Sequence, residues 1–424
     1  MKIKIQFVIL FLINSLFAHP SPNTLMFVDI KSNGVAAELR LPVGELGMAL
    51  NPKEPKIAEQ LLGGFTDSLK IYLLSHIKPL SMDGQKWSVE IGDMRLENVA
   101  DVNIRGTLQD IIVKIWLKPP TGASSRQFIL DYDVILHQVV THNAIVSIRQ
   151  DWEAGVIAEH PVEVGVIAVD PRDNTITPLS INQIKGGLWG GFKGMTRLGM
   201  RHIAEGTDHL MFLLVLLMAA PLLPAGKRWG AFGGMKYSLI RLIKIITAFT
   251  IGHSITLLIG AIGWVKLPNQ PIEVLIAFSI LISAIHAIRP IFPQKEAYMA
   301  IGFGLIHGLA FASTLSNLNL PTTQMTLSIL GFNVGIELMQ LMVIALIVPW
   351  LIILSKGSYY TSVRAVGATY AGVVALAWMM ERIVGQPNVL SVWASKFIEQ
   401  APYFILVLAL AALVSFWFER NETT

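Results

Sequence analysis

Several apolar segments of the chain contain ionisable side chains, and these residues carry the chemistry that the sequence suggests. A charged side chain at the centre of a membrane-spanning helix costs roughly 2.5–3.5 kcal/mol, so such residues usually pair with one another or serve a function. The candidate set consists of Asp208, His209, His253, His307, Glu337, Asn333, Glu273 and Glu205.

The types of these side chains favour a divalent metal ion. Imidazole nitrogens and carboxylate oxygens bind borderline ions such as Ni²⁺ and Zn²⁺. The chain has no cysteine, which excludes thiolate ligands. A proton relay would use the same groups. Glu205 and Glu273 lie near the ends of their segments, where contact with water explains them equally well, and His202 is interpreted as an interfacial residue.

The composition indicates that a large part of the chain lies in lipid. Hydrophobic residues make up 53% of the chain and charged residues only 15%. In soluble proteins, about a quarter of all residues are charged. The net charge of +4 is small, and the basic residues are scattered among apolar segments. Nucleic-acid binding, which needs a basic face, is therefore excluded.

Residues 1–18 are predicted to be a signal peptide. Lys2 and Lys4 precede the apolar stretch Phe7–Leu16, and Ser15–Ala18, which begins and ends with a small residue, is the expected cleavage region. Cleavage after Ala18 would make His19 the first residue of the mature chain. Its α-amine and ring could then chelate a metal ion. The favoured interpretation is that His19 simply follows the cleavage site and has no role in metal binding.

Residues 19–180 are predicted to form an all-β, sandwich-like domain outside the cytoplasm. Short segments rich in β-branched and aromatic residues, such as 25–30 and 111–117, alternate with turn signals such as Ser32-Asn33-Gly34. Several strands of this kind are typical of an antiparallel sandwich. One helix is expected at residues 56–74.

Residues 186–421 are predicted to form an α-helical polytopic membrane bundle of about seven transmembrane helices. The apolar runs cover residues 204–223, 240–262, 271–289, 298–317, 326–354, 363–381 and 402–418. Lys and Arg are concentrated in alternate loops, which the positive-inside rule places in the cytoplasm. We therefore expect a multi-pass protein of the inner cell membrane with an extracytoplasmic N-terminal domain and a cytoplasmic C-terminus. The signal peptide independently requires the same orientation.

Five polar motifs occur in order on five of these segments. They are residues 199–212, residues 249–257, Glu273 with Ser279, residues 304–311 and residues 332–340. Taken in this order, they resemble the HupE/UreJ family of hydrogenase- and urease-accessory membrane proteins, in its longer branch with an extracytoplasmic N-terminal domain. The resemblance implies a permease for a divalent transition metal, nickel being the family's usual assignment. It also implies metal ligation by Asp208, His209, His253, His307, Asn333 and Glu337.

Three functions remain open at this point. Transport of a divalent ion, nickel or zinc, through the intramembrane residues is favoured over catalysis. An intramembrane zinc-dependent hydrolase acting on a lipid or a peptide would use the same residue types, with Glu337 or Glu273 as the general base. A membrane-anchored receptor or assembly scaffold would bind a partner protein at the β-rich domain, but it leaves the ionisable residues within the membrane unexplained.

Overall fold

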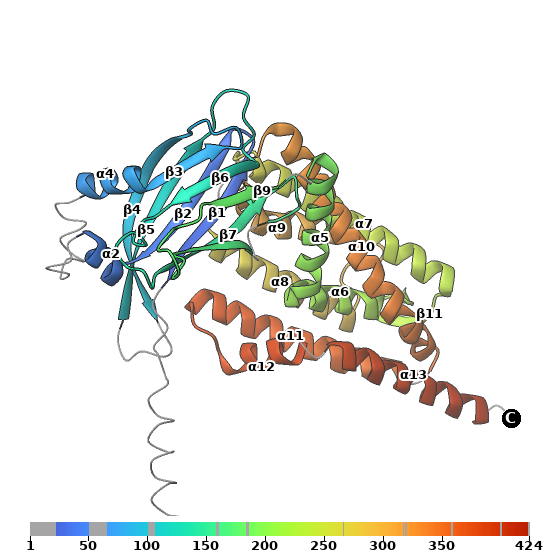
Figure 1. Ribbon diagram of the computed structural model, residues 1–424. Coiled ribbons are helices and arrows are strands. Elements are labelled where there is room, and N and C mark those ends of the chain that lie inside the picture. Colours follow the sequence, from blue (N-terminus) through green and yellow to red (C-terminus); the bar gives the residue numbers. More distant parts are fainter. Residues whose placement is uncertain are drawn as a thin grey trace, which may run out of the picture. The chain divides into compact units, whose positions relative to one another are not determined.

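The computed structural model divides the chain into two compact units at residue 190. The first unit holds most of the strands and the second holds the long helices (Figure 1). The structure describes residues 23–50, 66–100, 107–157, 161–183, 186–265, 267–316, 318, 320–357, 359–398 and 401–422. The predicted signal peptide and His19 lie outside these residues.

Two sheets build the first unit. The larger sheet has the strand order β4-β5-β2-β1-β7-β8, and the smaller sheet has the order β3-β6-β9. The strands are β1 (Thr24–Lys31), β2 (Gly34–Pro42), β3 (Ile77–Ser81), β4 (Ser88–Ala100), β5 (Thr107–Lys118), β6 (Gln127–Tyr132), β7 (Asn143–Asp151), β8 (Val162–Ala168) and β9 (Leu179–Asn182).

Both sheets contribute to one hydrophobic core. Along β1 and β6, buried residues alternate with half-buried ones, because successive side chains of a strand point to opposite faces. Met26 on β1 and Tyr132 on β6 are fully buried members of the same cluster. The β-rich character that the sequence predicted for this region is therefore confirmed.

Two features of this unit differ from an antiparallel, all-β arrangement. β1 pairs with β7 in parallel, which the long connection between the two strands permits. The helix α2 (Val43–Leu50) is also present. The helix α4 (Thr66–His76) overlaps the helix expected at residues 56–74, of which residues 56–65 lie outside the described residues. Leu46 of α2 and Leu73 of α4 are buried in the core, so each helix covers part of it with one apolar side.

The second unit consists of helices with one short hairpin. The helices are α5 (Leu188–Glu205), α6 (Thr207–Ala219), α7 (Met235–Ala261), α8 (Asn269–Ile288), α9 (Glu296–Ser316), α10 (Thr322–Ser355), α11 (Tyr360–Val384), α12 (Val389–Ile398) and α13 (Ala401–Glu422). The strands β10 (Leu222–Ala225) and β11 (Arg228–Phe232) form the hairpin between α6 and α7.

The described helices account for most of the predicted spans. Five of them, α7 to α11, are long and apolar enough to cross a membrane, and α5 with α6 form a sixth candidate as a bent pair. In α13, the described apolar stretch Ile405–Ser415 is shorter. The chain is thus a multi-pass membrane protein with five or six candidate spans in the part that the structure describes.

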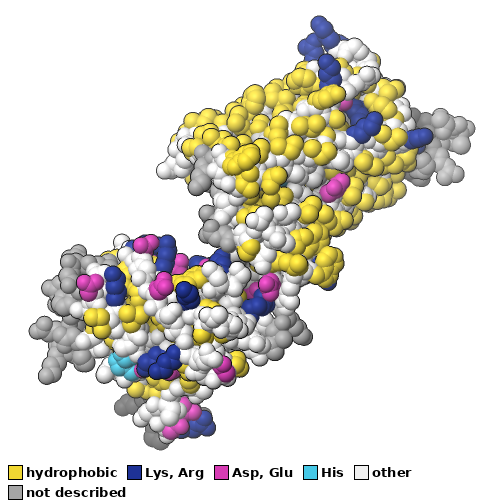
Figure 2. All heavy atoms as spheres, turned by 90° about the horizontal axis from the view of Figure 1, so that it is seen from above, with side chains coloured by type: hydrophobic (Ala, Val, Ile, Leu, Met, Phe, Trp, Pro, Cys, Tyr) yellow, Lys and Arg dark blue, Asp and Glu magenta, His cyan; other side chains and the backbone are white. Residues whose placement is uncertain are grey.

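Apolar side chains cover the outside of the helical unit. Ile251, Leu275 and Leu330 are examples, with 50%, 45% and 53% of their surface exposed. Figure 2 shows hydrophobic side chains over most of the visible face of this unit, whereas charged side chains are interspersed over the β-rich unit. A soluble protein rarely exposes so large an apolar surface, so lipid is its expected neighbour.

The predicted first span, residues 204–223, is not one straight helix. The chain bends by 71° between α5 and α6, and the linking residue Gly206 has an extended backbone conformation. A Cβ atom at Gly206 would lie 2.6 Å from the carbonyl oxygen of His202, so a glycine suits this close turn. The break falls among the polar residues of the first motif.

Helices α7 and α9 pack against each other through glycines. A Cβ atom at Gly304 would lie 2.1 Å from the carbonyl oxygen of Phe249, and one at Gly308 would lie 2.3 Å from that of His253. Small residues allow two backbones to approach in this way. Because Gly304 and Gly308 flank His307, this close packing brings the backbone on both sides of His307 against α7.

Candidate metal centre

Four histidines and an aspartate gather inside the helical unit. His202 belongs to the last turn of α5, Asp208 and His209 to the first turn of α6, His253 to α7 and His307 to α9. We call these five residues the histidine cluster. The bend at Gly206 puts His202 and His209 on different helices, yet their ring centroids are only 4.6 Å apart.

His209 contacts both Asp208 and His307. The Nδ1 atom of His209 lies 2.8 Å from Oδ1 of Asp208, and its Nε2 atom lies 3.3 Å from Nδ1 of His307. The ring of His202 is 6.2 Å from that of His253. Side chains from α5, α6, α7 and α9 therefore share one site.

The partners of His209 and His307 determine where their ring protons sit. The carboxylate of Asp208 can only accept, so Nδ1 of His209 donates to it and Nε2 keeps a lone pair. Ser279 Oγ on α8 donates to the carbonyl oxygen of Ile276, so it accepts a hydrogen bond from His307 Nε2 at 3.1 Å. Nδ1 of His307 therefore keeps a lone pair as well.

Two lone pairs thus face each other across 3.3 Å. They repel each other unless a cation or a proton lies between them. Two imidazole nitrogens bound to one ion at about 2.0–2.1 Å with a tetrahedral angle are about 3.3 Å apart. The spacing of His209 and His307 therefore suits a shared divalent ion.

Other ring nitrogens of the cluster lack a partner among the described residues. Both nitrogens of His253 and Nε2 of His202 are buried without a hydrogen bond. Buried polar atoms are nearly always bonded, so unpaired ones require an explanation. A ligand that accepts the lone pair of one nitrogen in each ring would supply part of that explanation.

Phenylalanine rings surround the histidines. The ring of Phe332 stacks on His253 at 6.2 Å, that of Phe249 lies 5.2 Å from His307, and that of Phe311 lies 4.9 Å from His202. Such a shell keeps water away and fixes the ring orientations. The site is therefore apolar around a few nitrogen and oxygen ligands.

The glutamates of the candidate set have other neighbours. Glu337 lies 3.5 Å from Thr247 Oγ1, the exposed Glu273 lies 3.7 Å from Arg382, and the exposed Glu205 lies 3.6 Å from Arg201. Among the described residues, none of these carboxylates is hydrogen-bonded or ion-paired to the histidine cluster. Their role as metal ligands stays a prediction.

Two amide side chains of α10, Asn333 and Gln340, belong to the same motif as Glu337. Asn333 follows Phe332, and its Oδ1 atom is buried without a hydrogen-bond partner. Gln340 is 3.4 Å from Thr250 on α7. Asn333 therefore has a free acceptor for a ligand, whereas Gln340 connects two helices.

His202 is the member of the cluster that sequence reasoning missed, since it was interpreted as interfacial. Its ring contacts those of His209, His253 and Phe311. Gly206, four residues later, is the signal that could have indicated the bend and hence the position of this histidine.

The family described as HupE / UreJ protein matches residues 180–382. Residues 180–382 are a HupE/UreJ family domain. The whole histidine cluster lies within this HupE/UreJ domain, as do the glycines that bring α7 and α9 together. No curated protein and no solved structure matches the chain.

Proposed function

We propose that the HupE/UreJ domain transports a divalent transition-metal ion across the membrane through the histidine cluster, with nickel as the substrate to test first. The observation that supports this most strongly is the distance of 3.3 Å between Nε2 of His209 and Nδ1 of His307, whose other ring nitrogens are bonded to Asp208 and Ser279. The family match adds support, because the resemblance of these motifs implies metal transport.

In this proposal, some residues of the histidine cluster bind the ion and others orient the ligands. Asp208 orients the imidazole of His209, and Ser279 orients that of His307, so that one nitrogen of each is ready to bind the ion. His202 and His253 offer further buried nitrogens nearby. Successive exchange of these ligands would move the ion between helices.

The proposed transport predicts that His253→Ala and His209→Ala each abolish uptake of Ni²⁺ into proteoliposomes, because each substitution removes a ligand. Ser254→Ala is the matched control on the next residue of α7, since its hydroxyl donates only to Thr250 O of the same helix, at 2.7 Å. Unchanged uptake by His253→Ala, or an equal loss in Ser254→Ala, would contradict the proposal.

The hydrolase alternative has weaker support from the geometry. Ser254 adjoins His253 in sequence, but its hydroxyl is bonded to Thr250 and the nitrogens of His253 have no described hydrogen-bond partner. The two residues therefore do not form a nucleophile and base pair of the kind that serine hydrolysis requires.

A further inference from the structure

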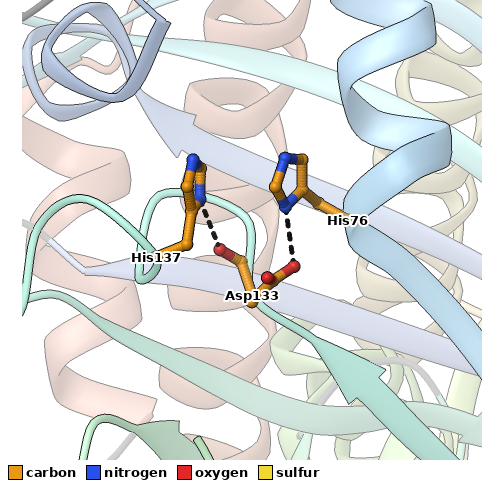
Figure 3. A group of neighbouring side chains, drawn as sticks. All are labelled: His76, Asp133 and His137. Carbon is orange, nitrogen blue, oxygen red and sulfur yellow. Dashed lines mark hydrogen bonds and ion pairs between the residues drawn. The ribbon is translucent and has the colours of Figure 1, made fainter. Parts of the chain in front are cut away.

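Three side chains of metal-ligand type meet in the β-rich unit (Figure 3). His76 is the last residue of α4, Asp133 directly follows β6, and His137 lies in the turn after it. One ligand atom from each residue lies within 4.8 Å of the other two. Neither histidine belongs to the candidate set of the sequence or to the HupE/UreJ domain.

Asp133 holds both imidazole rings. Its Oδ1 atom lies 2.8 Å from Nδ1 of His76, and its backbone carbonyl oxygen lies 3.0 Å from Nδ1 of His137. Because a carbonyl only accepts, Nδ1 of His137 carries the proton and Nε2 keeps its lone pair. This arrangement, with one ring nitrogen bonded to a backbone oxygen, is common for histidines that bind metals through the other nitrogen.

The two rings lie parallel to each other. Their centroids are 4.2 Å apart with an angle of 18° between the planes. Figure 3 shows one nitrogen of each ring turned towards Asp133 and the other turned away from it. An ion pair with Asp133 would need only one histidine. The presence of a second, stacked ring is therefore not explained by an ion pair.

The turn that presents His137 has an unusual backbone. Ile135 has a positive φ of 68°, a left-handed conformation that β-branched residues rarely adopt. Its amide donates to the hydroxyl of Tyr72 at 3.0 Å. Tyr72 also packs its ring 4.5 Å from that of His76. Strained conformations of this kind cluster at functional sites.

Water can reach this group. The side chains of His76 and Asp133 are 21% and 30% exposed, and His137 is half-buried. An ion held here would therefore keep coordination positions for water and could enter without a conformational change.

We propose that His76, Asp133 and His137 form a binding site for a borderline divalent transition-metal ion such as Ni²⁺, Zn²⁺ or Co²⁺. The ion would bind Nε2 of each histidine, and Asp133 would hold both rings through their Nδ1 atoms. Imidazole nitrogens suit these ions, whereas Mg²⁺ and Ca²⁺ prefer oxygen ligands alone. This site is separate from the histidine cluster, and it stands whether or not the chain transports metal.

Equilibrium dialysis of the full-length protein against Ni²⁺ tests the site, with an affinity tag that contains no histidine. We expect His137→Ala to bind one equivalent fewer than the parent protein. Asp133→Asn should weaken that equivalent about 10- to 100-fold, as loss of the partner that orients a ligand does. Asp131→Asn is the matched control, because it removes a half-buried carboxylate two residues earlier on β6.

The same measurement separates this site from transport. His253→Ala should retain the equivalent that His137→Ala loses, so a failure of the transport proposal leaves this result unaffected. Thermal unfolding in EDTA identifies variants that fail to fold. His137→Gln replaces His137→Ala if the latter unfolds. Equal Ni²⁺ binding by the parent, folded His137 variants and Asp133→Asn overturns the proposal, as does an equal loss in Asp131→Asn.

Discussion

A single hydrogen bond decides which nitrogen of His209 is available to a ligand. Asp208 accepts from Nδ1 at 2.8 Å and also from the backbone amide of His209 at 2.9 Å. The carboxylate is therefore held at the start of α6 by the same residue that it orients. In the proposed transport, Asp208 acts mainly by fixing the imidazole and by lowering the cost of a cation nearby.

Asp208→Asn tests this role at the residue scale. An amide could present its NH₂ group to Nδ1 and reverse the tautomer of His209, which would place a proton on Nε2 opposite His307. We expect the initial rate of Ni²⁺ uptake into proteoliposomes to fall about 10- to 100-fold. Ser279→Ala, which removes only the partner of His307 Nε2, should reduce uptake less. Wild-type uptake by Asp208→Asn would show that the orientation of His209 is unimportant.

The buried residue His286 does not belong to the histidine cluster but lies close to Glu296. His286 is 1% exposed, and its Nε2 atom lies 3.6 Å from Glu296. Glu296 also accepts a hydrogen bond of 2.5 Å from Arg241, and Arg241 donates to three backbone carbonyls at the end of α6 and in β10. His286 thus belongs to a buried network that also holds the end of α6 and the first strand of the hairpin.

At the element scale, we expect the distance between α7 and α9 to control the geometry of the histidine cluster. His253 belongs to α7 and His307 to α9, and the backbones of the two helices meet at Gly304 and Gly308. Close contact of two helix backbones leaves little room for adjustment, because interiors are packed without gaps. The helices therefore position the imidazoles as rigid elements.

Gly304→Ala is expected to lower both Ni²⁺ uptake and the thermal unfolding temperature, because the added methyl would lie 2.1 Å from the carbonyl oxygen of Phe249. Gly302→Ala is the matched control on α9, since a Cβ atom there meets nothing within 4 Å. The measurements are circular dichroism in detergent and uptake by proteoliposomes. If the two variants behaved alike, the packing of α7 on α9 would not control the site.

At the scale of the whole molecule, the orientation in the membrane is a proposal based on sequence. The signal peptide and the distribution of Lys and Arg together favour a β-rich unit outside the cytoplasm. In this orientation, the proposed His76 site would lie outside the cytoplasm.

Cysteine labelling tests this orientation without background, because the chain contains no cysteine. Trp264→Cys, in the loop after α7, should react with a membrane-impermeant maleimide added outside the cell, since Trp264 is 79% exposed. Ala225→Cys, in the hairpin before α7, should react only after the membrane is made permeable. The reverse pattern would invert the proposed topology.

Sequence alone predicted the features that depend on neighbouring residues. Apolar length and loop charge indicated the membrane bundle, and short strands separated by turn signals indicated the β-rich region. The polar motifs also indicated the HupE/UreJ family. Each of these properties is carried by a short stretch of chain and can be recognised without knowing where the rest of the chain lies.

Tertiary structure decided which of those side chains meet. It placed His202 in the histidine cluster, gave Glu273 and Glu205 arginine neighbours, and joined His76 to Asp133 across 57 positions of the sequence. The parallel pairing of β1 with β7 likewise joins distant segments. The physical reason is that a metal site depends on distances of a few ångströms between separate elements, and these distances follow from a bend at one glycine, from helix contacts and from sheet pairing.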